Sequence, residues 1–152
     1  MTSLNKHISS EQFTEHSQAM HRETIEWLSD IEFCRTEFAF LLKLIDREFL
    51  KVMGKQKPDD LEVLEKKVES FLEKTLGDLY SKTNRHEHNL FSINENVSEE
   101  TEKLIRSEHS KLSGKIAVLM TSVKEIKKEI FEVVEKQLKV AKEITTGYEE
   151  GE

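Results

Sequence analysis

The chain has 152 residues and a formal net charge of -7. This length is enough to bury a core, and the acidic balance repels nucleic-acid phosphates and anionic lipid headgroups. The single cysteine excludes an internal disulfide, no apolar run approaches the ~20 residues of a membrane span, and Met1–Phe13 lacks the apolar stretch of a signal peptide. We therefore expect a cytoplasmic protein that binds neither nucleic acid nor membrane.

Helical periodicity dominates the rest of the sequence. Apolar residues recur at steps of three and four over Ser10–Met53, Pro58–Leu90 and Ser98–Thr145. Only 5 glycines and 1 proline interrupt the chain, which argues against a fold rich in β-turns. We predict an all-α fold: an antiparallel bundle of about three long helices with coiled-coil-like packing, forming one domain over 1–146, followed by a flexible acidic tail over 147–152.

Residues suited to helix ends flank the three segments. Ser9 with Gln12 fits a capping box, and Gly54 suits the end of the first helix. Pro58 is typical of the first turn of a helix, and Ser98 is a good N-cap for the third. The connections are short, so consecutive helices are expected to lie side by side.

The expected lengths also predict how the helices are staggered. Trp27 is expected level with about Glu87, and His86 level with about Leu104. Two points stay open at this stage: whether the second helix continues past Asn84, and whether the third bends at Gly114. A glycine inside a helix allows either a bend or a close approach of a neighbouring chain.

Each segment carries one apolar row that predicts its buried face. The row of the second segment needs a shift of one residue to keep its spacing. The predicted rows are Met20, Thr24, Trp27, Ile31, Cys34, Phe38, Leu41, Ile45 and Val52; Val68, Leu72, Leu76, Leu79, Thr83, His86 and Leu90; and Ile105, His109, Leu112, Ile116, Leu119, Val123, Ile126, Ile130, Val133, Gln137, Val140 and Ile144. Cys34 and Trp27 therefore read as core residues, not as a nucleophile and a ligand platform.

Further apolar residues lie off these rows, and they indicate self-association. A helix that is apolar on more than one side needs more than two neighbours. We predict a homo-oligomer, or binding of another protein, through one set of residues: Phe33, Phe40 and Leu50 in the first helix and Phe131, Val134 and Leu138 in the third. The alternative is a monomer in which the third helix bends over a central first helix.

The histidines give a second hypothesis from a different class. His86 and His109 lie on the apolar rows, and Asp30 is expected level with His109. Histidines and carboxylates inside a helical bundle can hold iron, manganese or zinc, here with His21 or His88 as a further ligand. The Glu-x-x-His spacing of ferritin-like sites is absent, however. The competing interpretation is that both histidines are structural. We therefore assign no catalytic residue, no cofactor and no metal site. The alternative is a transition metal bound by His86, His109 and Asp30.

No motif in the chain predicts an enzyme. The glycines are isolated, so they form no phosphate-binding loop, and glutamates interrupt the lysines of the third segment. A small-ligand sensor is a third possibility that no residue pattern selects. The prediction with most support is a protein that acts through protein–protein contact.

Overall fold

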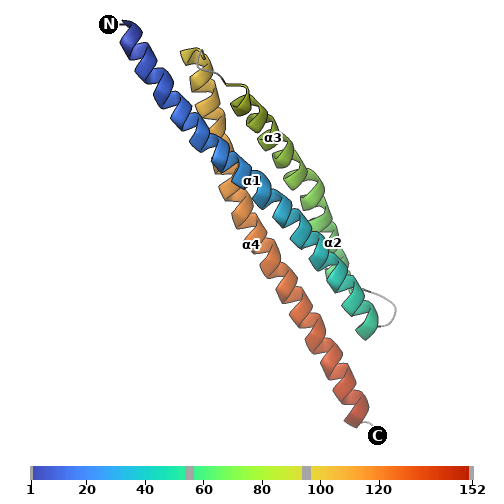
Figure 1. Ribbon diagram of the computed structural model, residues 1–152. Coiled ribbons are helices and arrows are strands. Elements are labelled where there is room, and N and C mark those ends of the chain that lie inside the picture. The colour runs from blue at the N-terminus through green and yellow to red at the C-terminus, as the bar shows by residue number, and fades with distance from the viewer. Residues whose placement is uncertain (1, 54–56, 94–96, 151–152) are drawn as a thin grey trace. The chain divides into compact units, whose positions relative to one another are not determined.

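The computed structural model is almost entirely helical in the parts of the chain that it describes (Figure 1). It describes the backbone of residues 2–53, 57–93 and 97–150, and the side chains of 15–48, 57–93, 97–140 and 142–143. The elements are α1 (Thr2–Met53), α2 (Asp59–Ser70), the π-helical segment η1 (Phe71–Leu76), α3 (Gly77–Phe91) and α4 (Glu99–Glu150). Since α2, η1 and α3 follow one another without a gap, the described residues form three helices, as predicted.

The helix boundaries confirm some predictions and correct one. α1 begins at Thr2, so Ser9 lies inside the helix and the predicted capping box is wrong. Neither glycine nor proline precedes Ser9, so nothing in the sequence stops the helix from extending. Ser98 does cap α4, because its Oγ accepts the N–H of Thr101 at 3.2 Å. Gly54 and 94–96 lie outside the described residues.

The second helix begins where its proline predicts. Pro58 directly precedes α2 with a φ of -56°, and its carbonyl accepts the N–H groups of Leu61 and Glu62, each at 3.1 Å. The helix then continues past Asn84 to Phe91, which answers one open question. Its end is closed by Ser92, whose N–H bonds to the carbonyl of His88 at 3.1 Å.

η1 explains the one-residue shift in the apolar row of the second helix. A π-helical turn holds an extra residue compared with an α-helical turn. Buried Leu61, Leu64 and Val68 precede η1, and buried Leu76 and Leu79 follow it. The extra residue returns the row to the same side of the helix, so the shift in the sequence is absorbed by local backbone geometry.

α4 is an unbroken helix through Gly114. A Cβ placed on Gly114 would meet no atom within 4 Å, so close packing does not require a glycine there. The helix extends through Glu150, and therefore includes most of the segment 147–152 that we predict as an acidic tail. No helix in the described residues has an apolar stretch long enough to cross a membrane.

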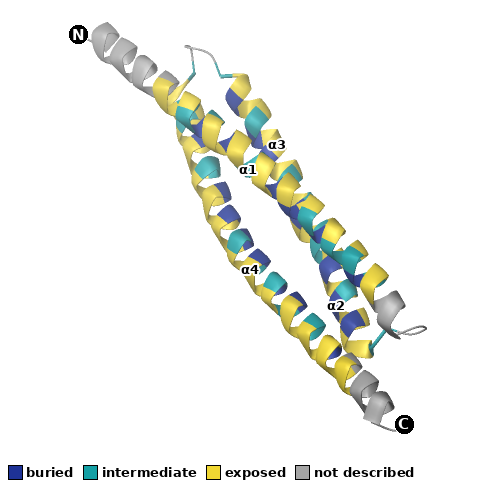
Figure 2. Ribbon diagram, turned by 60° about the horizontal axis from the view of Figure 1, so that its bottom comes forward, coloured by how far each residue is buried: buried dark blue, intermediate teal, exposed yellow. Residues whose placement is uncertain are grey.

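The chain divides into two compact units, and each of the three helices contributes residues to both. Unit 1 comprises Met1–Phe33 with Leu76–Leu119, and unit 2 comprises Cys34–Thr75 with Met120–Glu152. Figure 2 shows buried residues recurring along the helices between exposed ones. The buried residues of unit 1 are Met20, Thr24, Ile31, Leu76, Leu79, Thr83, His86, Leu90, Ile105, Leu112, Ile116 and Leu119. Those of unit 2 are Cys34, Phe38, Ile45, Leu61, Leu64, Val68, Val123, Ile126, Ile130 and Gln137.

These cores confirm most of the predicted apolar rows. Trp27, Leu41, Leu72, His109 and Val133 are partly buried, and Val140 is exposed. The side chains of Val52 and Ile144 lie outside the described residues. The rows succeed because steps of three and four keep side chains on one side of an α-helix.

Candidate functional site

The two histidines of the apolar rows meet in the core of unit 1. His86 Nε2, from α3, lies 2.9 Å from His109 Nδ1, from α4, which is hydrogen-bonding distance. The ring centroids are 5.2 Å apart and the rings are tilted by 35°. The sequence predicted both residues on buried faces, but it placed His86 level with Leu104, and that stagger is wrong. A short connection makes two helices neighbours, while interdigitating side chains set their offset.

The surroundings of the pair come from all three helices of unit 1. The side chain of His86 has no exposed surface, and Trp27 of α1 stacks on the His109 ring with centroids 4.6 Å apart. Thr83, one turn before His86, satisfies its own hydroxyl by donating to the Leu79 carbonyl at 2.7 Å. His86 is therefore fully buried, and one face of the His109 ring is covered by Trp27.

A glutamate stands at each end of the pair. Glu23 Oε2, from α1, lies 3.1 Å from His109 Nε2. Glu108 Oε2, from α4, lies 3.7 Å from His86 Nδ1, which is too long for a hydrogen bond. His86 Nδ1 is accordingly a buried polar atom without a hydrogen-bond partner in the described residues. The four groups form a row in the order Glu23, His109, His86, Glu108.

The row fixes which nitrogens carry protons when both rings are neutral. A carboxylate only accepts, so His109 Nε2 must donate to Glu23. A neutral imidazole has one N–H, so His109 Nδ1 is an acceptor and His86 Nε2 donates to it. His86 Nδ1 is then left as a lone pair facing the carboxylate of Glu108. When both rings are neutral, His86 Nδ1 is therefore the one ring nitrogen of the row without a hydrogen-bond partner, and binding of one proton would make it a donor toward Glu108.

Burial lowers the pKa of His86 below its ordinary value of 6.5. The nearby carboxylate of Glu108 opposes this by raising the pKa, and a charge on His109 lowers it further. Desolvation is the largest of these effects because an imidazolium loses its hydration in the core. Burial in the core therefore favours the uncharged form of His86.

A third histidine joins two helices of the same unit. His21 Nδ1, from α1, lies 2.7 Å from Glu87 Oε1, from α3. We expected Trp27 level with Glu87, so the predicted stagger of these helices is wrong by six residues. His88, the other candidate ligand, is exposed, and its carbonyl accepts the Ser92 hydroxyl at 2.8 Å.

Asp30 is not brought to the histidines in the described structure. It is exposed, and Glu23, one heptad earlier on α1, takes the position beside His109. Among the described residues, no group of three or more histidine, cysteine, aspartate or glutamate side chains is arranged to hold a metal ion. Of the proposed metal ligands, the structure brings only His86 and His109 together among the described residues. Metal binding itself stays a prediction.

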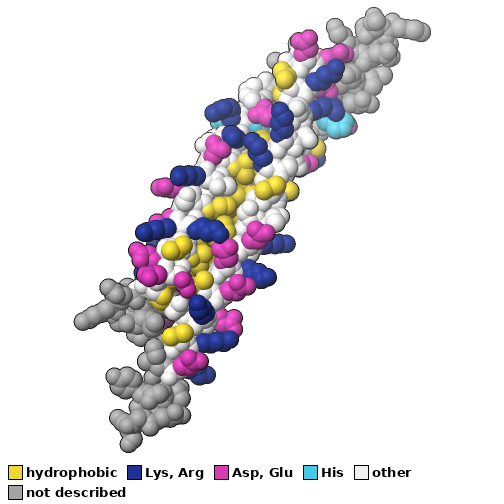
Figure 3. All heavy atoms as spheres, turned by 180° about the vertical axis from the view of Figure 1, so that it is seen from behind, with side chains coloured by type: hydrophobic (Ala, Val, Ile, Leu, Met, Phe, Trp, Pro, Cys, Tyr) yellow, Lys and Arg dark blue, Asp and Glu magenta, His cyan; other side chains and the backbone are white. Residues whose placement is uncertain are grey.

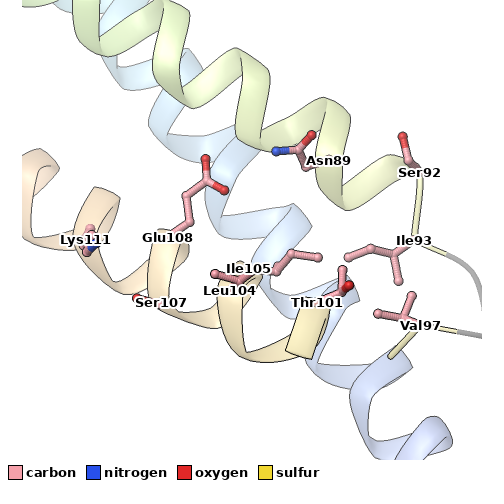
Figure 4. Close-up of a pocket in the computed structure, with 10 residues that line it drawn as sticks. All are labelled: Asn89, Ser92, Ile93, Val97, Thr101, Leu104, Ile105, Ser107, Glu108 and Lys111. Atoms are coloured by element: carbon pink, nitrogen blue, oxygen red, sulfur yellow. The ribbon is translucent and has the colours of Figure 1, made fainter. Parts of the chain in front are cut away.

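An open cavity lies next to this site in unit 1. It encloses about 600 Å³ and is lined by residues of α3, α4 and the segment between them. Figure 4 shows Ile93, Val97 and Ile105 at its apolar end and Glu108 extending from α4 toward α3. Glu108 therefore lies both in the wall of the open cavity and 3.7 Å from the unpartnered Nδ1 of His86.

Unit 2 contains a charged cluster that the sequence did not predict. Lys57 forms ion pairs with Asp46 of α1 and with Glu65 of α2, the second at 2.9 Å. Hydrogen bonding to Asp46 and then to Glu65 raises the pKa of Lys57, so the ammonium stays charged. Burial raises the pKa of Glu65, while its bond to Lys57 lowers it. No spacing marks these residues as partners, because each lies on a different segment.

Comparisons with known proteins leave the function to be argued from this geometry. No family model, no curated protein and no solved structure matches the chain.

Proposed function

We propose that this chain is a non-enzymatic helical-bundle protein that acts through protein–protein contact, beginning with association with itself. The proposal includes the finer architecture predicted from the sequence, an antiparallel bundle with coiled-coil-like packing. The observation that carries it is the exposure of large apolar side chains at heptad spacing on two helices. Exposed apolar rows of this kind are typical of interaction surfaces.

In α1, Phe33 and Phe40 are seven residues apart and are 66% and 63% exposed. They lie away from the buried row of Ile31, Cys34 and Phe38. Residues seven apart on a helix share one side, so the two phenylalanines form a strip that the neighbouring helices leave uncovered. Phenylalanine in water is costly, and burying one side chain contributes about 1.5–3 kcal/mol.

A matching strip lies on α4 in unit 2. Phe131 and Leu138, again seven apart, are 61% and 50% exposed, while Ile130 and Gln137 beside them are buried. Figure 3 shows hydrophobic side chains at the surface among lysines, arginines and carboxylates. Val134, also predicted in the interface, is partly buried, and the side chain of Leu50 lies outside the described residues. Mixed charges around an apolar strip favour a specific contact over unspecific aggregation.

The test is sedimentation equilibrium over a wide range of concentration, on the wild-type chain and on the double variant Phe40→Glu with Leu138→Glu. The wild type is expected to associate, and the double variant to associate at least tenfold more weakly, because each new carboxylate would be buried in an apolar contact. The matched control is Ala39→Glu with Lys128→Gln, which makes the same charge change at exposed positions beside the strips.

Circular dichroism and urea unfolding establish that each variant keeps its helices. A wild type that sediments as a monomer at all concentrations would contradict the proposal. So would a double variant that associates as strongly as the control.

A further inference from the structure

We propose that His86 and His109 form a proton-binding switch in unit 1, which holds a first proton with the pair intact and is separated by a second. The inference goes beyond the proposed association and does not depend on it. It rests on the row of four groups from Glu23 to Glu108 and on the one unpartnered buried nitrogen within it.

The first proton completes the row. When it binds at His86 Nδ1, that nitrogen becomes a donor toward the Glu108 carboxylate, which lies 3.7 Å away and needs only a small side-chain shift to accept it. The other two hydrogen bonds keep their direction, from His86 to His109 and from His109 to Glu23. The charge of the four groups changes from -2 to -1, and every nitrogen then has a partner.

The second proton has no such place. It can bind only at His109 Nδ1, which would turn the acceptor of the central hydrogen bond into a donor. Two N–H groups and two positive charges would then face each other across 2.9 Å. This repulsion is relieved when the rings move apart, and because the rings belong to α3 and α4, the contact between those helices opens with them.

The two glutamates have different roles in the supply of protons from solvent. Glu108 lines the open cavity beside α3 and α4, and its side chain is 40% exposed, whereas His86 is fully enclosed. The proton thus reaches His86 from water by way of the Glu108 carboxylate. At the other end Glu23, 55% exposed, holds His109 in the tautomer that the row requires.

Other titratable groups of the three helices face this region. α1 contributes Glu23 and His21, α3 contributes Glu87, and α4 contributes Glu108. Burial disfavours protonation of His86, and the carboxylate of Glu108 favours it. His21 Nδ1 lies 2.7 Å from Glu87 Oε1, a contact between α1 and α3 in the same unit.

The test is nitrogen NMR of the histidine rings in the full-length chain, titrated from pH 7.5 to 4.5. At pH 7.5 His86 and His109 are both expected as Nε2–H tautomers with a hydrogen bond between the rings. On acidification the two rings are expected to titrate in two separate steps, with the signals of α3 and α4 unchanged in the first step and shifted in the second.

Variants assign the first step to Glu108. Glu108→Gln removes the charge that faces His86 and is expected to lower the proton affinity of His86 about tenfold, a shift of about one pH unit. Glu100→Gln, which neutralises an exposed carboxylate of α4 in the same unit, is the matched control and should leave the titration unchanged.

Three results would overturn the proposal. The first is an Nδ1–H tautomer of His86 at neutral pH, which is measured on the wild type and needs no variant. The second is a single titration step shared by both rings. The third is a Glu108→Gln titration equal to that of Glu100→Gln.

Discussion

The two units differ in how their helices hold polar contacts. In unit 1, three contacts between helices pair a histidine with a glutamate: His21 with Glu87, His86 with Glu108 and His109 with Glu23. In unit 2, three contacts between helices pair a lysine with a carboxylate: Lys67 with Glu129, Lys127 with Glu37 and Lys136 with Asp60. A histidine changes charge near pH 6.5 and a lysine stays charged far above neutrality. We therefore expect acid to weaken unit 1 more than unit 2.

The buried cores differ in the same sense. Unit 1 buries Thr24, Thr83 and His86 among its apolar residues, whereas Gln137 is the buried polar residue that the structure describes in unit 2. A buried polar atom without a hydrogen-bond partner is costly, and in unit 1 His86 Nδ1 is such an atom. Unit 2 also has two, Asp46 Oδ1 and Glu65 Oε1, but both carboxylates form ion pairs with Lys57. Similar apolar rows therefore hold different polar groups in the two units, and we expect these few residues to decide how each unit responds to pH.

The largest expected effect comes from the apolar core of unit 2. Phe38 is fully buried and packs edge-on against Phe71 with ring centroids 6.0 Å apart. Phe38→Ala should lower the free energy of unfolding by about 3–5 kcal/mol, because it leaves a cavity. Phe40→Ala, two residues along and exposed, is the control and should cost less than about 1 kcal/mol in the monomer. Equal losses in urea unfolding would show that the assigned core is wrong.

The histidine pair should contribute less to the free energy of unfolding than Phe38 does, and its contribution should depend on pH. His86→Leu removes the donor to His109 Nδ1 and should cost about 1–3 kcal/mol at pH 7.5. His88→Leu, at an exposed position of α3, is the control and should change stability by about 0.5 kcal/mol or less. A larger loss in the control than in His86→Leu would contradict the account of the core.

The direction of the pH effect follows from the lowered pKa of His86. Between that lowered pKa and the ordinary value of 6.5, the unfolded chain binds more protons than the folded chain. The free energy of unfolding must therefore fall as pH decreases through 6.5, by at most about 1.4 kcal/mol per pH unit for each proton. In urea unfolding His86→Leu should show a smaller slope than the wild type. A wild-type stability that rises on acidification from pH 7 would contradict this sign.

The smallest effect is expected at the lysine cluster of unit 2. Lys57→Met leaves the carboxylates of Asp46 and Glu65 near each other without their shared cation. Because the cluster is partly open to solvent, the loss should be about 1 kcal/mol or less, and smaller still in 1 M salt, which screens the charges. Chemical unfolding at two salt concentrations measures it. A loss independent of salt would mean that Lys57 acts through packing of its aliphatic stem.

The helices and most of the core could be predicted from the sequence, because spacing alone selects the buried side. Leu112, Ile116 and Leu119 lie at steps of three and four and are all buried. The N-terminal boundary could not be predicted, since Ser9 is compatible both with a cap and with a helix interior. The apolar row of the second helix keeps its spacing only if it is shifted by one residue, and the structure assigns this shift to the π-helical turn η1.

The sequence predicts the histidines of the candidate site but not the carboxylates beside them. His86 and His109 were expected on facing helices because both interrupt apolar rows. Their partner carboxylates were missed, since Asp30 and Glu23 lie on α1 one heptad apart and only the axial stagger decides between them. Glu108 carried a weak signal as the neighbour of His109 in the sequence. Stagger is set by many side-chain contacts at once, and no single residue in the sequence reports it.

Hydrogen exchange resolved by residue at pH 7.5 and pH 5.5, corrected for the intrinsic rates, tests the contrast between the units most directly. The free energy of opening should fall at pH 5.5 for buried backbone of unit 1, such as Leu79–Leu90 of α3, and stay unchanged for Leu61–Val68 of α2 in unit 2. An equal fall in both units, or a fall confined to unit 2, would contradict the account.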